Sequence, residues 1–335
     1  MHKRILGVTT AALLSSLGLA ACGNQAAKAP ATRAPASAAP ASAPSHLTTV
    51  TLEIPNPGAA FTPFYVGQAL GIYKHYGINL KLIHMAPPLA VQAILSGKLD
   101  FMSAIGSAAR SAEEGEPMRI VEVVANHLDF VLVGAKGITH VSQLRNQTVV
   151  GESAVGEANL IESMILKQHG LPPGTYKVVN VEGGDAARAA LVEAGKAQAT
   201  VVEFTGAIPL QKKGFPILAT ASKILQPFTG LATSLSFLHA HPGLTRRMVI
   251  ATIEATRVTR DDEAKTVPVL MKTFHMSKQD ASTLWKDLDN EWGHGGRPNP
   301  VAIQNEMKAD QAALKLSHPP KPSQVFDFNY LPKSQ

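Results

Sequence analysis

Segments of strand character alternate with segments of helix character along most of this chain, and this alternation constrains the fold more than any other feature. It begins with a strand at Val50–Ile54, a helix at Pro63–Tyr76 and a half-buried strand at Ile78–His84. Strands that alternate with helices favour a largely parallel sheet covered by helices on both faces. The sequence therefore predicts an α/β fold.

The alternation runs through two series. The second extends from a strand at Thr148–Val150 to a strand at Pro216–Ala219, and Leu231–Leu238 is expected to return to the first sheet. A mainly helical remainder follows, with helices predicted at Pro242–Arg260, Asp261–His275, Ser277–Asp287 and Pro300–Ala313. Two α/β units in series, each large enough for its own core, are the expected organisation.

Residues 1–21 have the layout of a secretory signal peptide. The basic residues His2–Arg4 precede an apolar run, Ile5–Ala21, that is too short and too interrupted to predict a membrane-spanning helix. The run ends at Leu19–Gly23, L-A-A-C-G, which resembles a bacterial lipobox, and Cys22 is the single cysteine of the chain. We predict acylation of Cys22, a palmitate-type membrane anchor. An ordinary cleaved signal that happens to contain a cysteine is the alternative.

Residues 22–46 are rich in Ala, Pro and Ser, a composition that predicts a disordered tether. The net charge is +6, but Lys3, Arg4, Lys28 and Arg33 all precede the first acid, Glu53, and subtracting these four charges leaves +2 for the body. This small charge, without a basic stripe, argues against a nucleic-acid partner.

Three segments carry a family resemblance. Thr62–Leu82 reads T-P-F-Y-V-G-Q-A-L-G-I-Y-K-H-Y-G-I-N-L-K-L, Ala93–Phe101 reads A-I-L-S-G-K-L-D-F, and Ile138–Val149 reads I-T-H-V-S-Q-L-R-N-Q-T-V. In this order and spacing they resemble periplasmic binding proteins of the nitrate/sulfonate/taurine type. That family, NMT1/THI5-like, shares a domain with thiamine-pyrimidine binding and synthesis proteins. The resemblance covers Leu47 to about Gly243 and, more loosely, the C-terminus.

The resemblance implies a type II periplasmic-binding-protein fold, with two α/β lobes of mainly parallel sheets joined by two hinge segments and a ligand between the lobes. We expect one lobe at 47–134 plus 230–335 and the other at 135–229. The crossings would lie near Val133–Gly137 and Thr229–Thr233. The resemblance also implies an ABC permease and its ATPase as partners of a monomeric, exported protein.

Three departures from the family pattern concern its ligand. Gln143 stands where the family has Asp, and Asn146 where it has Gly. The family's serine-rich helix start, which often meets ligand, is replaced by Ala154–Asn159. This replacement argues against nitrate or a sulfonate as the ligand.

Ligands of α/β sheets bind beyond the carboxyl ends of the strands, where helix N-termini present free N–H groups. The turns at the predicted strand ends contain hydroxyl and amide side chains for neutral hydrogen bonds, glycines that permit close backbone approach, and one aromatic residue suited to ligand contact. Helix capping is the alternative role of the hydroxyl residues. With the acids discussed next, the candidate ligand-binding residues are Asn56, Thr62, Tyr65, Gly106, Ser107, Asn126, Ser153, Glu157, Asp185, Glu203 and Thr205.

Acidic residues gather at the strand ends of the second series. Stabilisation of helix N-termini is the alternative explanation for Glu157 and Asp185, but Glu203 follows the apolar strand Ala199–Val202, where that explanation fails. Glu152 and Glu182 also lie beside strand ends. Carboxylates facing a closed cleft favour a cationic or neutral heterocycle or amine over a sulfonate. Arg188, expected at the surface, would reverse this preference if it faced the cleft.

No motif of the sequence indicates an enzyme. Gly151–Gly156, G-E-S-A-V-G, departs from the hydrolase G-x-S-x-G by one position, and H-E-x-x-H, Walker and dinucleotide motifs are absent. No cysteine follows Cys22, which counts against the family's synthase branch. We therefore predict a lipid-anchored solute-binding protein of an importer, at the outer face of the cytoplasmic membrane or in the periplasm, without cofactor, metal or catalytic residues. A thiamine-pyrimidine-synthase-like or hydrolytic enzyme and a ligand sensor on the same fold are the alternatives.

Overall fold

The computed structural model describes residues 46–152, 157–181, 184–288 and 292–333, and Ala43–Gln335 forms one compact unit. The predicted signal peptide, Cys22 and nearly all of the tether lie outside the described residues, as do Ser153 and Glu182. Among the described helices, none is long and apolar enough to cross a membrane.

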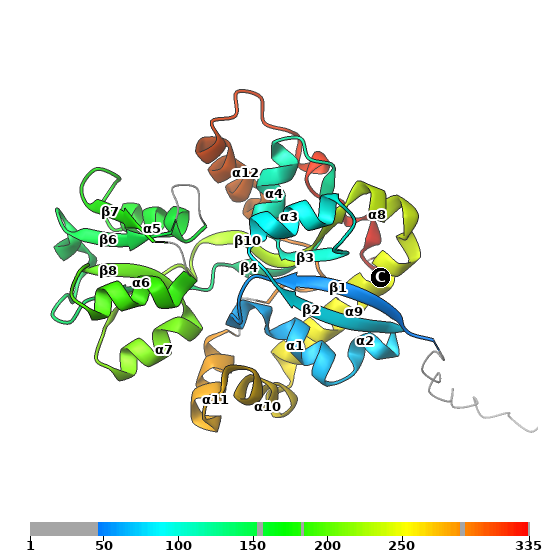
Figure 1. The fold of residues 1–335 in the computed structure, drawn as a ribbon, viewed down its shortest axis with the longest axis horizontal. Coiled ribbons are helices and arrows are strands. Elements are labelled where there is room, and N and C mark those ends of the chain that lie inside the picture. The colour runs from blue at the N-terminus through cyan, green and yellow to red at the C-terminus, as the bar shows by residue number, and fades with distance from the viewer. Residues whose placement is uncertain (1–45, 153–156, 182–183, 289–291, 334–335) are drawn as a thin grey trace, which may run out of the picture. The chain divides into compact units, whose positions relative to one another are not determined.

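Two five-stranded mixed sheets organise the unit (Figure 1). We call each sheet with its covering helices a lobe. The first sheet has the order β2-β1-β3-β10-β4, in which β1 runs parallel to β2 and β3, and β10 runs antiparallel to β3 and β4. Its strands are β1 (Thr48–Ile54), β2 (Ile78–His84), β3 (Phe101–Ala104), β4 (Met118–His127) and β10 (Leu225–Ser234).

The second sheet repeats this arrangement with the order β7-β6-β8-β5-β9. Here β6 runs parallel to β7 and β8, and β5 runs antiparallel to β8 and β9. Its strands are β5 (Phe130–Gly134), β6 (Thr148–Gly151), β7 (Lys177–Asn180), β8 (Ala199–Glu203) and β9 (Ile217–Thr220). The predicted fold of two α/β lobes is confirmed, and both sheets are mixed: β10 in the first and β5 in the second run antiparallel to their neighbours.

The helices follow the predicted series closely. The first lobe begins with α1 (Thr62–Ala69), α2 (Ile72–His75), α3 (Pro87–Leu95) and α4 (Ile105–Glu113), and the second contains α5 (Glu157–Gln168), α6 (Gly184–Glu193) and α7 (Phe204–Lys212). The C-terminal helices are α8 (Leu235–Ala240), α9 (Pro242–Asp261), α10 (Glu263–Phe274), α11 (Lys278–Asp287) and α12 (Pro300–Leu314). Short 3-10 turns occupy Ala59–Phe61, Val141–Leu144, Pro322–Gln324 and Phe328–Tyr330.

Two predicted elements are divided in the structure. The single helix expected at Pro63–Tyr76 is interrupted at Gly71, whose φ of 72° is left-handed and ends α1 before α2 begins. The strand expected at Leu231–Leu238 ends at Ser234, because the Ser234 hydroxyl accepts a hydrogen bond from the Phe237 N–H and caps α8.

The crossings between the sheets lie earlier in the chain than the sequence predicts. Since β4 ends at His127 and β5 already pairs in the second sheet from Phe130, the first crossing is Leu128–Asp129 and not Val133–Gly137. The return crossing lies between β9 and β10, at 221–224, and not at Thr229–Thr233. Each crossing leads into an antiparallel strand: the first leads into β5 and the second into β10.

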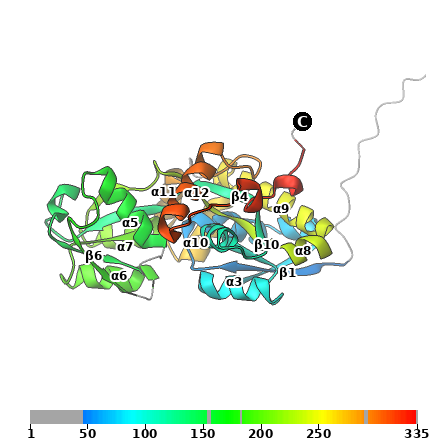
Figure 2. The same ribbon diagram turned by 90° about the horizontal axis from the view of Figure 1, so that it is seen from above.

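Alternating strand residues bury apolar side chains on both faces of each sheet. In the second lobe, Val149 and Val201 pack in the same core as Ile161 of α5, whereas Val150 and Val202 pack with α6 and α7 in a separate core. Figure 2 shows α5 and α6 on opposite sides of this sheet. This double burial explains why the strands are apolar along their length.

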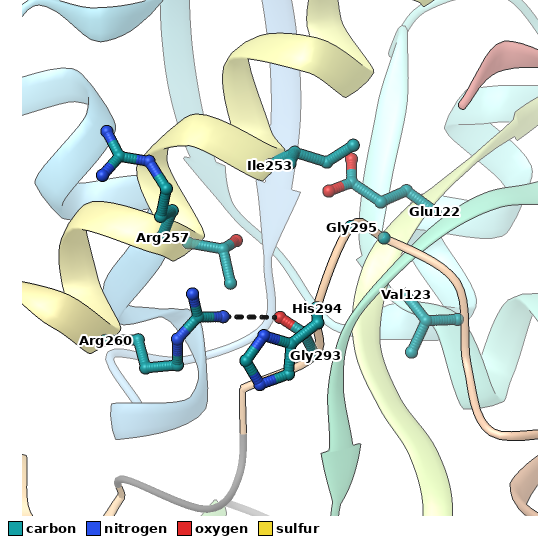
Figure 3. Close-up of a pocket in the computed structure, with 10 residues that line it drawn as sticks. Glu122, Val123, Ile253, Arg257, Arg260, Gly293, His294 and Gly295 are labelled. Carbon is teal, nitrogen blue, oxygen red and sulfur yellow. Dashed lines mark hydrogen bonds between the residues drawn. The ribbon is translucent and has the colours of Figure 1, made fainter. Parts of the chain in front are cut away.

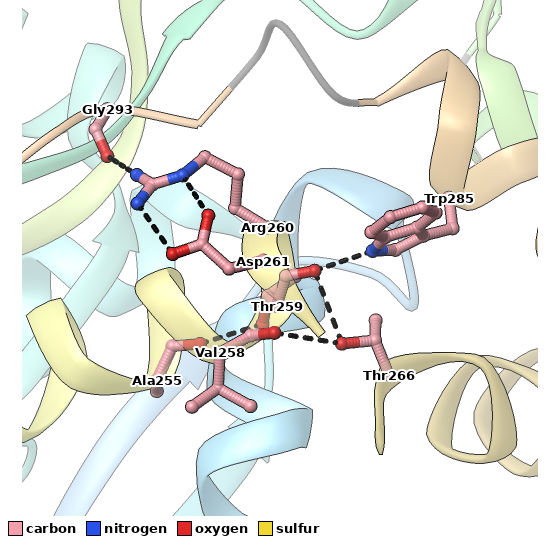
Figure 4. A network of polar contacts seen from close by, with 8 residues as sticks. All are labelled: Ala255, Val258, Thr259, Arg260, Asp261, Thr266, Trp285 and Gly293. Atoms are coloured by element: carbon pink, nitrogen blue, oxygen red, sulfur yellow. Dashed lines mark hydrogen bonds and ion pairs between the residues drawn. The ribbon is translucent and has the colours of Figure 1, made fainter. Parts of the chain in front are cut away.

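The C-terminal helices are tied together by hydroxyl and indole groups around the end of α9 (Figure 4). The Thr259 hydroxyl donates to the Ala255 carbonyl at 2.8 Å, and the Thr259 carbonyl accepts from Trp285 Nε1 of α11 at 2.6 Å and from the Thr266 hydroxyl of α10 at 3.2 Å. Buried hydroxyl groups in α9 are satisfied in this way within the helix.

Candidate functional site

The turn after β1 meets the end of β8, so that side chains of the two lobes come together. Asn56 Nδ2 donates a hydrogen bond to Glu203 Oε1 at 3.1 Å. Gly58 lies against the same carboxylate, since a Cβ atom added at Gly58 would fall 1.9 Å from Glu203 Oε2. Both Asn56 and Glu203 are predicted ligand-binding residues, and the structure brings them into direct contact.

Glu203 is buried, with 4% of its surface exposed. Burial raises the pKa of its carboxyl well above the ordinary value, and the neighbouring carboxylates of Asp185 and Asp129 raise this pKa further. The hydrogen bond from Asn56 acts in the opposite direction but is too weak to compensate. A positive charge near Glu203 would therefore be strongly favoured over a second negative charge.

The backbone at the start of α7 is held by two carboxylates. Asp185 Oδ2 accepts a hydrogen bond from the Glu203 N–H at 2.7 Å, and Asp129 Oδ1 accepts one from the Phe204 N–H at 3.3 Å. Asp185 also forms an ion pair with Arg188, whose Nε donates to the Val201 carbonyl at 3.3 Å. The expectation that Arg188 lies at the surface is wrong, because 2% of Arg188 is exposed and its charge is directed to Asp185.

The side chain of Glu53, a residue of β1, places its carboxylate in the equivalent position at the end of β3. Its Oε2 accepts hydrogen bonds from the backbone N–H groups of Ser103 at 2.9 Å and Ala104 at 3.3 Å, immediately before α4. Burial raises the pKa of Glu53 to about 7, despite these hydrogen bonds, and the Glu157 carboxylate contributes to the rise. Glu53 Oε1 is buried and has no hydrogen-bond partner within the described part of the chain.

A second contact between the lobes lies at the start of α4. A Cβ atom added at Gly106 would fall 2.9 Å from Glu157 Oε1 of α5 and 3.4 Å from Glu306 Oε1 of α12. Burial raises the pKa of Glu157 to about 7, although Arg110 lowers it. Arg110 itself donates to Asp310 Oδ1 at 3.4 Å, so its charge is shared among several acids.

These acids form one electrostatically linked group. Glu157 raises the pKa of Glu53 and of Glu203. Asp185 and Asp129 raise the pKa of Glu203 as well. We call this set the interlobe carboxylates: Glu53, Asp129, Glu157, Asp185 and Glu203. No group of three or more His, Cys, Asp or Glu residues suited to hold a metal ion occurs in the described ranges.

The remaining predicted residues take several positions. The Thr62 hydroxyl is buried and donates to the Ala59 carbonyl at 2.6 Å, so it serves the local turn. The Ser107 hydroxyl accepts from Arg110 Nη2 at 3.3 Å beside the second contact. Thr205 lies half-buried in the first turn of α7. Ser153 is outside the described residues.

Tyr65 and Asn126 carry buried polar atoms. Burial raises the pKa of Tyr65, with a further contribution from Glu203, and its ring packs edge-on against Phe274 with centroids 6.1 Å apart. Neither Tyr65 OH nor Asn126 Oδ1 has a hydrogen-bond partner among the described residues. The influence of Glu203 on its pKa places Tyr65 beside the interlobe carboxylates. Asn126, a residue of β4, lies instead against Gly293.

Sequence reasoning misses five residues of this region: Glu53, Arg110, Asp129, Glu306 and Asp310. One signal for Glu53 was present, because a charged residue interrupts the apolar strand Thr48–Ile54 just before its carboxyl end. For Glu306, the signal was its spacing of four residues from Asp310, which places both acids on one face of α12. Both acids of α12 are buried.

A separate cavity of about 100 Å³ lies within the first lobe (Figure 3). Its walls come from β4, α9 and the segment 293–296, and Arg260 Nη1 donates to the Gly293 carbonyl at 3.3 Å across one side. Glu122, 1% exposed, forms part of the wall, and burial raises its pKa well above the ordinary value. Because one lobe supplies every wall, this cavity is distinct from the interlobe carboxylates.

Comparison with solved structures reveals the same fold in proteins of low sequence identity. A ligand-binding component of an ABC-type import system from Staphylococcus aureus, with zinc bound, superposes with a TM-score of 0.68 at 16% identity over 85% of this chain and 97% of that chain. The periplasmic nitrate-binding protein NrtA from Synechocystis PCC 6803 gives a TM-score of 0.69 at 12% identity over 85% and 87%. The desulfurization enzyme DSZB gives 0.64 at 14% over 84% and 97%.

The sequence itself was compared with curated proteins and with family models. No curated protein matches it. The family model described as NMT1/THI5 like matches residues 58–264, which include every strand of the second sheet and most of the first. Sequence and two-lobed topology agree, and the chain belongs to the NMT1/THI5-like family.

Proposed function

We propose that this protein is the exported solute-binding component of an ABC importer, which captures a small molecule between its lobes and delivers it to a permease and its ATPase. The contact of Asn56 with Glu203 carries the proposal, because polar side chains from two lobes converge there at the carboxyl ends of strands, where α/β folds bind ligands. Family membership and the likeness to an ABC-type import component and to NrtA support it.

The mechanism follows from the two crossings. In the described part of the chain, the backbone passes between the lobes at two short links beside β5 and β10, so separation of the lobes would break the Asn56–Glu203 hydrogen bond and expose both side chains. A solute that enters between them would restore polar contacts to both lobes and favour the closed form. A permease can then recognise the closed form.

We also propose that the protein acts as a monomer held at the membrane by acylated Cys22. The lipobox-like sequence before Cys22 and the Ala/Pro/Ser-rich stretch to residue 46 support this anchor and tether. The tether would allow the body to reach a permease from a fixed point on the membrane.

The likeness to DSZB supports an enzyme of the same fold as the second candidate. Full-length protein purified without denaturation should release a small molecule on unfolding, identified by mass spectrometry. Readdition of that molecule should stabilise the protein, and it should be recovered with its mass unchanged after prolonged incubation. Conversion to a product would favour the enzyme. A strain that lacks the chain should lose uptake of the solute, and unchanged uptake would favour a sensor.

A further inference from the structure

The backbone donors at two strand ends are already occupied by carboxylates of the protein. Glu53 accepts from the N–H groups of Ser103 and Ala104 before α4, and Asp185 accepts from the Glu203 N–H before α7. Backbone donors that precede a helix are the usual binding place of anionic ligands in α/β folds. At these two places an anionic solute would have to displace a side chain that already carries the matching charge.

The two arginines of the region are likewise engaged. Arg188 is paired with Asp185, and Arg110 is paired with Asp310 and lies near Glu157 and Glu306. Burial lowers the pKa of Arg110, but the three surrounding acids together raise it above its ordinary value. Neither guanidinium is therefore available as the main counterion of a sulfonate or nitrate. The acids outnumber the arginines.

An acceptor atom remains in the middle of this group. Glu53 is fully buried, and its Oε1 accepts no hydrogen bond from the described residues, while its other oxygen holds the backbone before α4. Glu157 lies close enough to interact electrostatically with it. A buried carboxylate oxygen without a donor is costly, and a ligand that donates a hydrogen bond relieves this cost.

We infer that the solute is a cation, an amine-bearing molecule whose N–H groups are held by Glu203, Glu157 and the free oxygen of Glu53. This inference rests on the proposed function and specifies its solute. An ammonium group carries three donors and no acceptor, which matches a site of carboxylate oxygens. Asn56 would release Glu203 Oε1 to the solute and could itself accept a hydrogen bond through its carbonyl oxygen.

Probes that share one carbon frame but differ in charge test the inference. Full-length protein is titrated by calorimetry at pH 7.5 with butylamine, 1,4-diaminobutane, butane-1-sulfonate and 1,4-butanediol, and with nitrate. We expect one or both amines to bind, and the sulfonate, nitrate and diol not to bind. Glu203→Gln should raise the Kd of the amine at least tenfold. Glu193→Gln should leave it unchanged, because Glu193 pairs with Lys213 at 2.8 Å on the surface of the second lobe.

Glu157→Gln provides a second variant should Glu203→Gln fail to fold, and its amine Kd should also rise. Binding of the sulfonate or nitrate in preference to the amines would overturn the cationic solute and leave solute binding intact. If none of the probes binds, the solute released on unfolding decides: a cation supports the inference, and an anion or a neutral molecule overturns it. Failure of every probe together with release of no solute would count against both the inference and the proposed function.

Discussion

Asn56 and Glu203 lie 147 residues apart in the chain, yet Asn56 Nδ2 donates to Glu203 Oε1 at 3.1 Å. The first residue follows the first strand of one sheet, and the second ends a strand of the other. Their hydrogen bond therefore reports directly on the approach of the two lobes. Any change that keeps these side chains apart should affect solute binding without disturbing either core.

Gly58→Ala should interfere with this approach. The φ of Gly58 is −96°, which alanine adopts freely, so the substitution introduces no backbone strain. The new Cβ would fall 1.9 Å from Glu203 Oε2 and 2.8 Å from its Cδ, and the carboxylate would have to move away from Asn56. We expect the Kd of the solute recovered from the native protein to rise about tenfold, equal to roughly 1.4 kcal/mol, as measured by calorimetry.

Gly243→Ala is the matched control for that experiment. Gly243 lies in the first turn of α9, and a Cβ added there meets no atom within 4 Å. Its solute Kd should equal that of the wild type. An unaltered Kd in Gly58→Ala as well would show that the two lobes need not approach at Glu203.

The stability of the protein without solute should fall as the pH rises from about 5 to about 8. Burial raises the pKa of Glu53 and of Glu157 to about 7, so the folded state holds protons that the unfolded state releases near pH 4.5. The loss of stability therefore begins near pH 4.5 and is complete once the pH exceeds about 7. For fully buried Glu53 it is at most about 3 kcal/mol.

Urea denaturation at pH 5 and pH 8 measures this loss in the wild type and in Glu53→Gln. Because glutamine does not titrate, the difference in unfolding free energy between the two pH values should be smaller in the variant. Equal differences in the two proteins would mean that Glu53 does not retain its proton in the folded state.

Glu122→Gln should stabilise the protein at alkaline pH. Glu122 is buried at the wall of the first-lobe cavity, and its Oε2 has no hydrogen-bond partner among the described residues. Burial raises its pKa, so its ionisation at high pH opposes folding. We expect the variant to be more stable than the wild type at pH 8 by roughly 1–3 kcal/mol, by urea denaturation. At pH 4, where the group is protonated in both states, the two proteins should be equally stable.

Cys22→Ser should move the protein from the membrane fraction to the soluble fraction. Acyl chains contribute about 0.8 kcal/mol per buried CH₂ group, and serine cannot receive them at this position. Fractionation of cells followed by immunoblotting measures the change, and mass spectrometry of the wild type should detect the acyl groups on Cys22. A variant that still sediments with membranes would refute the lipid anchor.

The sequence predicts the order of strands and helices well, because apolar alternation and helix-ending glycines lie in the local pattern. It misplaces the first crossing, since β4 and β5 are both apolar and only Leu128–Asp129 separates them. Nothing in those two residues indicates that the chain leaves the first sheet and enters the second. The pairing of β5 with β8 places β5 in the second sheet, and β8 is distant from β5 in the sequence.

The candidate site divides in the same way. Asn56 and Glu203 are predictable because one follows β1 and the other ends β8, at the edge of each sheet where α/β folds bind ligands. Glu53 escapes prediction because it lies within β1, and only the path of its side chain brings it to Ser103. For Glu306, the spacing from Asp310 places both acids on one face of α12, but only the packing of α12 against the first lobe brings that face to the site.

The position of β10 has a consequence for the order in which the lobes fold. All strands of the second sheet lie between Phe130 and Thr220, so that lobe is a continuous piece of chain. The first sheet is different, since β10 is the one named strand that pairs with β4 in the described structure, and β4 therefore joins the sheet when residues 225–234 are available. Because the chain is synthesised from its N-terminus, the second lobe can be complete before β10 is available to the first lobe. The first lobe would then complete its sheet beside a second lobe in which Glu203 already has its final position.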